Sequence, residues 1–313
     1  MSLLSSFSHR LPHLPAALGL PLPFSPRLPA PPEPVFTLYD YPGSRPQTQA
    51  IPATIWSYWT GGTPPLLVQR CIAGWKRLHP EHDIRVLSDA ELSRYIPHLP
   101  AAVERLIPAK RADWIRLELL RRHGGIWLDA SIVLTRPLDW VHALQEAQQS
   151  DFVGFYLEGF TSLPRYPVVE NWFLAAPAHS PLIEEWQEEF TRHAIVDSGA
   201  AYVRHLEQQG HFDRIRQKIL YLDYLSMHLA FQQILQTQGH YRLTLQRVED
   251  GPYFYHVLAH WKRRRLHRLL FRGNCSAGVP SLVKLRGADR RHFDEDLEAH
   301  RHAPHSFVAR YLT

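Results

Sequence analysis

The stretch RRHGGIWLDASIVLTRPL, residues 121–138, contains the change of pattern that decides the fold. A charged, helix-forming segment ends at Gly124 and Gly125, and a strongly apolar segment with strand character begins directly after them. One carboxylate, Asp129, stands inside the apolar segment. Because burying a carboxylate is costly unless a cation or a metal ion pairs with it, Asp129 is the first candidate for a functional residue.

Segments of strand and helix character alternate around this stretch. Strands are predicted from β-branched and aromatic runs, and helices from apolar residues spaced three and four apart. The alternation predicts an α/β fold with a mostly parallel central sheet flanked by helices. The expected elements are a strand over 53–59, a helix over 66–79, a strand over 83–88, a helix over 109–123, a strand over 126–134, and helices over 180–194 and 221–236.

The first 50 residues have a different composition from the rest of the chain. They contain Pro12, Pro15 and nine further prolines of the 26 in the sequence. Proline fixes φ and lacks a backbone donor, so this segment is not expected to pair into a sheet or to wind into a helix. We therefore predict an extended proline-rich tail over residues 1–48, followed by one folded domain over residues 49–313.

Composition excludes several classes of protein. The two cysteines, Cys71 and Cys275, rule out a disulfide framework or a cysteine-rich zinc site, and they favour a reducing cytoplasm. There is no apolar run of about 18 residues for a transmembrane helix, no GxGxxG after a predicted strand and no phosphate-binding Walker loop. The 20 histidines show no HExxH or paired spacing, so we interpret most of them as surface or locally satisfied residues.

Three charged residues are expected to meet near the glycine pair. Asp113 and Arg116 are three positions apart on one helix and therefore share a face. Asp129 follows at the end of the next strand, and ligands of open α/β sheets bind outside the carboxyl ends of strands. The three side chains are thus predicted to converge on one pocket. The alternative is that Asp113 and Arg116 form a surface ion pair and that Asp129 only begins a turn.

Three segments carry a resemblance to a known family. They are residues 51–88, residues 109–138 with D-x-x-R, a double glycine and an apolar strand ending in Asp, and residues 170–186. Together they resemble the capsular polysaccharide synthesis family of bacterial glycosyltransferases, which is similar to DxD-containing sugar transferases. The likeness covers roughly residues 50–190. It implies a GT-A fold and the transfer of a hexose from a nucleotide sugar, with retention at the anomeric carbon.

The same resemblance implies roles for individual residues. Trp56 corresponds to the aromatic residue that stacks on the donor base. Asp113 and Arg116 correspond to the pair that holds the donor sugar and its phosphate, and Asp129 to the first aspartate of the DxD motif. The implied catalytic residues are Asp113, Arg116 and Asp129, and the implied donor-binding residues are Trp56, Asp113, Arg116, Gly124, Gly125 and Lys284.

Metal dependence is left open by a departure from the motif. Ser131 stands where the second carboxylate of DxD is found, and a hydroxyl is a weaker ligand for Mn²⁺ or Mg²⁺ than a carboxylate. Asp129 and Ser131 are therefore candidate metal ligands, or Asp129 positions the sugar hydroxyls directly. Lys284 is a candidate for stabilising the leaving diphosphate, and otherwise an ordinary surface lysine. Glu170 and Asn171 are candidates for the acceptor side, although Asn171 could instead cap a turn.

The expected partners follow from these roles and from the charge of +5. We expect a UDP-sugar donor and a glycan or lipid-linked acceptor in surface or capsular polysaccharide synthesis, and no nucleic acid. The basic stretch over residues 260–273 suggests peripheral contact with the inner face of a membrane, or else a solvated helix with its apolar face in the core. Two other readings are a basic protein that binds membranes or anionic polymers, and an inactive transferase-like protein, suggested by Ser131.

Overall fold

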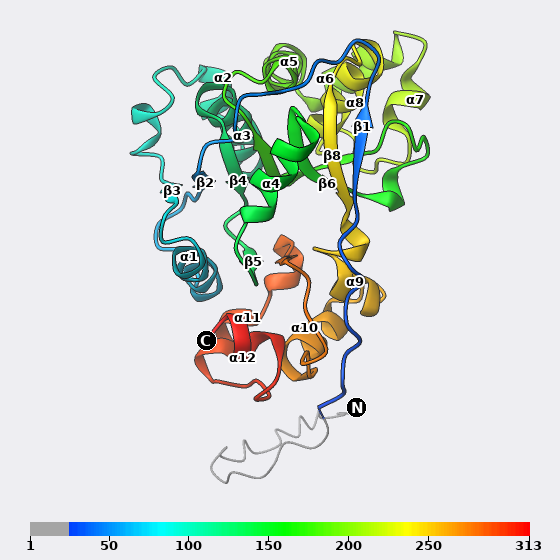
Figure 1. The fold of residues 1–313 in the computed structure, drawn as a ribbon. Coiled ribbons are helices and arrows are strands. Elements are labelled where there is room, and N and C mark those ends of the chain that lie inside the picture. Colours follow the sequence, from blue (N-terminus) through cyan, green and yellow to red (C-terminus); the bar gives the residue numbers. More distant parts are fainter. Residues whose placement is uncertain (1–24) are drawn as a thin grey trace, which may run out of the picture.

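A seven-stranded sheet forms the centre of the protein, whose computed structural model describes residues 25–313 (Figure 1). A separate pair of short strands lies below it. The strands of the large sheet are β1 (Phe36–Asp40), β2 (Thr54–Tyr58), β3 (Asp83–Leu87), β4 (Gly125–Leu128), β6 (Phe152–Tyr156), β7 (Val169–Ala176) and β8 (Arg242–Arg247), and those of the small sheet are β5 (Ile132–Leu134) and β9 (Leu282–Lys284).

Most strands of the large sheet point the same way. Their order is β1-β8-β6-β7-β4-β2-β3. β2 is parallel to β3 and β4, β6 is parallel to β8, and β7 is antiparallel to both β4 and β6. Consequently β2, β3, β4, β6 and β8 share one direction, and only β7 and β1 run against them. The predicted α/β class with a mostly parallel sheet is confirmed, and five strands end at the same edge.

Both faces of the sheet are buried, because successive residues of a strand point to opposite faces. In β4, Ile126 and Leu128 belong to one apolar core and Trp127 to the other. Helices cover the two faces and explain why the strand is apolar throughout. The helices are α1 (Leu66–Leu78), α2 (Ala101–Glu104), α3 (Pro108–His123), α4 (Asp139–Gln148), α5 (Pro181–Glu189), α6 (Gly199–Glu207), α7 (Phe212–Arg216), α8 (Ser226–Thr237), α9 (Phe254–Leu258), α10 (Arg263–Arg272), α11 (Phe293–Glu298) and α12 (Phe307–Tyr311).

Two predicted helices differ in extent from the observed ones. The helix expected over 180–194 is α5 followed by a π-helical segment, Phe190–Ile195. The helix expected over 221–236 begins only at Ser226. None of the helices in the described residues is both long enough and apolar enough to cross a bilayer.

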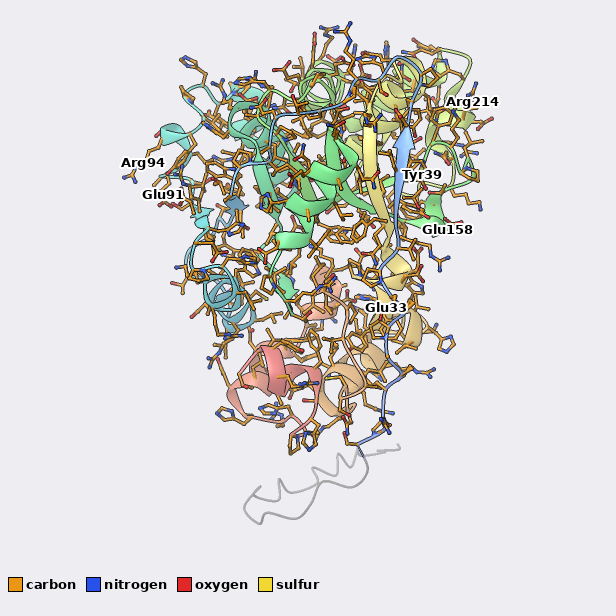
Figure 2. The ribbon with its side chains drawn as sticks, viewed as in Figure 1. Glu33, Tyr39, Glu91, Arg94, Glu158 and Arg214 are labelled. Atoms are coloured by element: carbon orange, nitrogen blue, oxygen red, sulfur yellow. The ribbon has the colours of Figure 1, made fainter. Side chains whose placement is uncertain are left out.

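Residues 25–48 belong to the folded domain, so the prediction that they form a tail outside it is wrong. β1 pairs with β8 along its whole length, Tyr39 of β1 packs 6.2 Å from Tyr156, and Leu28 and Tyr41 are buried (Figure 2). The physical reason is that residues 36–40 contain no proline and occupy an edge of the sheet, where flanking prolines interrupt no second ladder. The part of the predicted tail over residues 1–24 lies outside the described residues.

The basic stretch over residues 260–273 contains α10. Its apolar side chains Leu266, Leu270 and Phe271 are buried against the rest of the protein, and it contacts α12. Its basic side chains face outward; these are Arg263, Arg264, Arg265 and Arg268. α10 is therefore a solvated helix with its apolar face in the core, as the alternative interpretation had it. This apolar face is not free to enter a membrane.

Candidate active site

A cavity of about 1080 Å³ opens at the edge where the five parallel strands end. Tyr58 reaches it from the end of β2, Asp129 from the residue after β4, and Leu157 from the residue after β6. β7 runs the other way, so its first residues, Glu170 and Asn171, lie at the same edge. The topology of the sheet therefore gathers residues from distant parts of the chain around one cavity.

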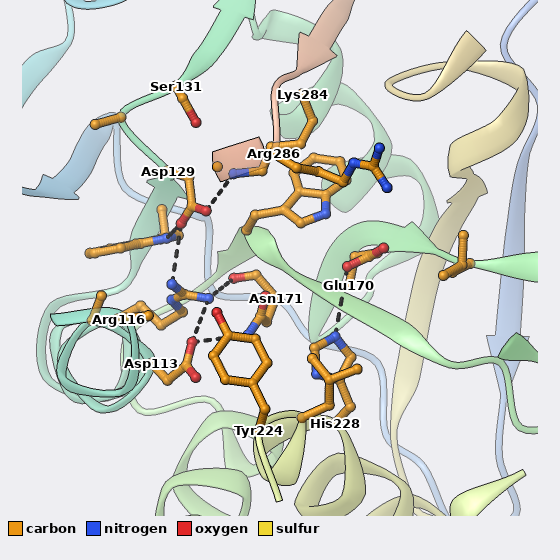
Figure 3. Close-up of a pocket in the computed structure, with 18 of the residues that line it drawn as sticks. Asp113, Arg116, Asp129, Ser131, Glu170, Asn171, Tyr224, His228, Lys284 and Arg286 are labelled. Carbon is orange, nitrogen blue, oxygen red and sulfur yellow. Dashed lines mark hydrogen bonds and ion pairs between the residues drawn. The ribbon is translucent and has the colours of Figure 1, made fainter. Parts of the chain in front are cut away.

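Asp129 lies between two cations on the floor of this cavity (Figure 3). Lys284 Nζ donates to Asp129 Oδ2 at 2.5 Å, and Arg116 Nη2 donates to Oδ1 at 3.2 Å. Trp127 Nε1 also donates to Oδ1, at 3.1 Å. Burial by itself raises the pKa of the carboxyl, but Lys284 and Arg116 outweigh burial and hold the pKa of Asp129 below its ordinary value.

The position of Lys284 depends on the small sheet. β5 follows Asp129 by three residues and pairs antiparallel with β9, with Ile132 opposite Lys284. This pairing joins segments more than 140 residues apart and brings the lysine beside the carboxylate. Lys284 is buried and pairs with Asp129, so it is not the ordinary surface lysine of the alternative interpretation.

Asp113 and Arg116 form a buried pair that continues the cluster. Arg116 Nη1 lies 3.1 Å from Asp113 Oδ1 and donates to the carbonyl oxygen of Asn171 at 2.7 Å. Asn171 Nδ2 in turn donates to Asp113 Oδ1 at 3.0 Å. Both charged residues are buried, so the alternative of a surface ion pair is wrong. The Asn171 side chain orients Asp113, and does not cap a turn.

Glu170 faces a different part of the same cavity. Its Oε2 lies 3.7 Å from His228 Nε2 of α8, and both side chains are buried and line the cavity. Figure 3 shows this pair apart from the group formed by Asp113, Arg116 and Asp129. Glu170 is therefore a carboxylate available on the second side of the cavity, whose lining also includes Glu249.

Two arginines of the site were missed by sequence reasoning. Arg286 lines the cavity two residues after Lys284, and Arg290 follows four residues later. Asp289 fixes Arg286 through a two-pronged contact, with Arg286 Nε donating to Oδ2 at 2.8 Å and Nη2 to Oδ1 at 2.9 Å. The alternating basic residues of SLVKLRG were the available signal, because alternate positions of an extended segment share a side.

Aromatic residues at the mouth of the cavity were also missed. Tyr221, Tyr224 and Trp261 line the cavity with large exposed rings, and the guanidinium of Arg286 lies 5.2 Å above the ring of Trp261. Tyr224 and Tyr221 precede α8, whereas Trp261 follows α9. Their sequence positions show no common pattern, so only the fold identifies them as one group.

Trp56 does not occupy the place that the resemblance implied. Its side chain is 1% exposed in the core, and its Nε1 donates to the carbonyl oxygen of Gly124 at 2.8 Å. Tyr58 and Trp59 line the cavity in its stead. The reason is depth along the strand, because Trp56 lies two residues before the end of β2 and Tyr58 is its last residue.

Gly124 and Gly125 also lie away from the cavity. Gly124 is the C-cap of α3 and Gly125 begins β4 at the edge opposite Asp129, with φ of +61° and +104° respectively. A Cβ on Gly124 would lie 2.3 Å from the backbone nitrogen of Ala178, and one on Gly125 would lie 2.6 Å from the carbonyl oxygen of Thr54. Both glycines form a closely packed turn with positive φ. The expectation that they bind the donor is therefore wrong.

Replacing Trp56 by alanine is expected to lower the free energy of unfolding by about 3–5 kcal/mol, because it leaves a large cavity in the core. Nucleotide affinity of the folded fraction should stay within about twofold of the parent. Urea denaturation and calorimetric titration measure the two quantities. Trp59→Ala, which changes a cavity-lining ring, is the matched control. A stable Trp56→Ala protein with greatly weakened nucleotide binding would restore the stacking role.

The residues expected to bind a metal do not form a fitting donor set. Both carboxylate oxygens of Asp129 accept hydrogen bonds from Trp127 or from cationic side chains. The hydroxyl of Ser131 donates to the carbonyl oxygen of Leu285 at 2.9 Å. Mn²⁺ and Mg²⁺ require several free oxygen ligands, and two neighbouring cations oppose a third. As arranged, Asp129 and Ser131 do not fit a divalent cation.

The sequence matches a family model described as "Capsular polysaccharide synthesis protein" over residues 37–194, half of the chain. The chain belongs to this family. Among curated proteins it is similar to glycosyltransferase afumC of Aspergillus fumigatus, 29% identical over 47% of this chain and 41% of that protein. It is similar also to O-glycosyltransferase braB of Annulohypoxylon truncatum, 29% identical over 44% and 37%. This family member thus spans about two fifths of the length of these relatives.

Two solved structures are similar to this family member at low identity. The PaToxG glycosyltransferase is 13% identical, with a TM-score of 0.37 over 87% of each chain. The UDP-bound glycosyltransferase domain of the YGT toxin is 9% identical, with a TM-score of 0.35 over 64% of this chain and 80% of that one.

Proposed function

We propose that this protein is a glycosyltransferase of GT-A type. It moves a sugar from a nucleotide sugar, for which a UDP-sugar is the favoured candidate, to a hydroxyl group of a glycan or of a lipid-linked carrier. The observation that carries the proposal is the carboxylate Asp129, held by Arg116 and Lys284 on the floor of a large cavity at the ends of parallel strands. Membership of the capsular polysaccharide synthesis family and the names of the curated relatives support it.

The cationic wall of the cavity suits a diphosphate. Lys284, Arg286 and Arg290 come from one short segment and line the same cavity. Within the described residues, Arg290 Nε is buried and has no hydrogen-bond partner. Guanidinium and ammonium groups bind phosphate oxygens through charge-assisted hydrogen bonds. We therefore assign these three side chains to the two phosphates of the donor.

The group of residues around Asp113 and Asp129, next to the cationic wall, suits a sugar. Asp113 and Asp129 are carboxylates whose positions are fixed by Arg116 and Asn171. Carboxylates accept hydrogen bonds from hydroxyl groups, and fixed acceptors select one sugar orientation. We assign Asp113 and Asp129 to the hydroxyls of the donor sugar, with Arg116 and Asn171 as positioning residues.

The proposed reaction breaks the bond between the anomeric carbon and the diphosphate oxygen, and the nucleoside diphosphate leaves with the electron pair. Lys284 and Arg286 stabilise the negative charge that develops there. The acceptor oxygen forms the new bond to the anomeric carbon, and its proton passes to the leaving phosphate or to a nearby carboxylate. Glu170, beside His228, is the carboxylate that we assign to the acceptor side.

The exposed aromatic rings at the mouth suit the acceptor. Tyr221 is 77% exposed and Tyr224 50%. Flat apolar rings pack against the faces of sugar rings and against apolar carriers. The basic face of α10 is a candidate for contact with an anionic membrane, and because its apolar face is buried such contact would be electrostatic and weakened by salt.

A thermal-shift and calorimetric screen of nucleoside diphosphates and nucleotide sugars tests the donor. A ligand that binds only the folded protein raises the melting temperature by mass action. The expected result is a rise with UDP and with one UDP-sugar, lost in Lys284→Met. Release of nucleoside diphosphate from the stabilising sugar then tests turnover. Binding without turnover in the presence of acceptors would favour the inactive transferase-like protein, and no binding of any nucleotide would overturn the proposal.

Nucleotide binding is expected to be independent of divalent metal. Lys284, Arg286 and Arg290 already supply positive charge, and Asp129 is not free to bind a cation. Affinity for UDP should change less than about threefold between EDTA and millimolar Mn²⁺, whereas a metal-bridged diphosphate would lose most of its binding energy. Calorimetric titration under the two conditions measures this, and a Mn²⁺-dependent gain of tenfold or more would contradict it.

A further inference from the structure

A cluster of histidines lies at the edge of the sheet opposite the cavity. His79 is the C-cap of α1, and His82 immediately precedes β3, which runs from that edge toward the cavity. His142 lies in the first turns of α4 and faces His82. This cluster shares no residue with the proposed active site, so the inference does not depend on the proposed function.

Three side chains of the cluster are arranged as metal ligands. Within the described residues, one ligand atom each of His79, Glu81 and His82 lies within 4.8 Å of the others. Glu81 Oε1 is 2.9 Å from His82 Nδ1 and 3.8 Å from His79 Nδ1. Ligand atoms about 2.0–2.1 Å from a tetrahedral zinc ion lie roughly 3.3–3.4 Å apart, a value between these two separations.

The burial of His79 is a second, independent indication of a bound metal ion. The residue is 1% exposed, and neither of its ring nitrogens has a hydrogen-bond partner among the residues that the structure describes. A buried polar ring without a partner is costly, and buried polar groups are normally satisfied. A cation bound at Nδ1 would satisfy the ring.

The orientation of His142 determines which nitrogen of His82 carries a proton. His142 Nε2 lies 3.4 Å from His82 Nε2. When His142 Nε2 is the acceptor in this contact, His82 Nε2 is the donor. His82 Nδ1 is then a lone pair that faces the Glu81 carboxylate at 2.9 Å. An imidazole lone pair and a carboxylate oxygen at this distance are held together by a proton or by a bound metal ion.

We propose that His79, Glu81 and His82 bind a divalent transition-metal ion, with zinc as the best match. Imidazole and carboxylate are ligands of zinc, and water completes a tetrahedral set. His142 is the outer partner that orients His82. The carbonyl end of α1, a helix of 13 residues, adds a favourable negative field. The ion would fix the turn between α1 and β3, and the contact of His82 with His142 would connect that turn to α4.

Metal content and stability test the site in the full chain, free of any affinity tag. Bound metal is removed from the protein with EDTA, and the protein is then equilibrated with excess zinc and dialysed. The zinc that remains bound is measured by elemental mass spectrometry. About one tightly bound ion per chain is expected, together with a rise in melting temperature. Bound Co²⁺ should give the visible absorption of a tetrahedral site. His142→Ala should weaken zinc binding by about 10- to 100-fold.

Glu81→Gln and His82→Ala should each lose the tightly bound ion, the cobalt spectrum and the zinc-dependent rise in melting temperature. Glu81 is exposed, so its replacement tests the site without endangering the core. His193→Ala is the matched control, because His193 is half-buried and stacks 4.5 Å from His205 without a carboxylate between the rings. Failure of the parent protein to retain zinc, or equal loss in His193→Ala, would overturn the proposal, and a proton would then bridge Glu81 and His82.

Discussion

Asp129→Asn is expected to reduce sugar transfer by about 10²–10³-fold, the usual effect of removing one well-placed electrostatic group. The asparagine keeps the shape of the side chain, but one of its two positions becomes an NH₂ donor that faces Arg116 or Lys284. Arg116 and Lys284 then lose the negative charge that holds them in position beside the donor. Affinity for the nucleotide sugar should fall toward that for the free nucleoside diphosphate, because the contact with the sugar is lost.

The same substitution is expected to cost stability, since Asp129 pairs with two buried cations. Removing one partner of a buried pair typically costs about 3–5 kcal/mol, and the 26% exposure of the Asp129 side chain places the expected loss below that range. The loss should depend on pH. Because the pKa of Asp129 is lowered in the folded state, its stabilisation is full above the unfolded pKa of about 3.9 and is lost as pH falls through the folded value. The stability difference between parent and variant should therefore begin to shrink as pH falls below about 4, and disappear below the folded pKa of Asp129.

Asp151→Asn separates the functional effect from the structural one. Asp151 is also a buried carboxylate, but it accepts from the backbone nitrogen of Arg242 at the start of β8 and does not line the cavity. Burial raises the pKa of Asp151, so its neutral replacement should cost less stability than Asp129→Asn and should leave transfer by the folded protein unchanged. If Asp129→Asn behaves in the same way, Asp129 is only structural and the proposed site is wrong. Denaturation curves and initial rates at saturating nucleotide sugar decide between these results.

Removing residues 1–48 is expected to destabilise the domain severely. The deletion takes away β1, the side chains of Leu28 and Tyr41 from the two cores, and the partner of β8 along five residue pairs. Two buried side chains of this size contribute roughly 3–6 kcal/mol, a large share of the 5–15 kcal/mol that stabilises a typical protein. The newly exposed edge of β8 should also promote aggregation.

A chain that starts at residue 25 is the matched control, because it keeps every contact described for β1. Thermal unfolding monitored by circular dichroism and light scattering compares the two truncated chains with the full chain. The chain that starts at residue 49 should melt well below the control and aggregate on heating. Equal melting temperatures for both truncated chains would show that β1 adds nothing to the stability of the sheet.

The sequence by itself determined the local structure and much of the chemistry. The apolar run over 126–134 predicted one strand, which the structure divides into β4 and β5 around a turn that begins at Asp129. The glycine pair before the run predicted the end of α3, because backbone conformation depends on residue type. The sequence also placed Asp129 at a strand end, and the spacing of Asp113 and Arg116 placed them on one helical face. These three residues are neighbours in the structure, as their spacing predicted.

Only the tertiary structure decided which distant residues complete the cavity. Lys284 reaches Asp129 through the pairing of β5 with β9, and the sequence pattern of a three-residue strand does not specify its partner. Trp56 and Tyr58 have the same strand character, and only their distance from the sheet edge puts one in the core and the other in the cavity. β1 was missed for the same reason: an edge strand between prolines becomes stable only when β8 offers it a ladder and a buried face.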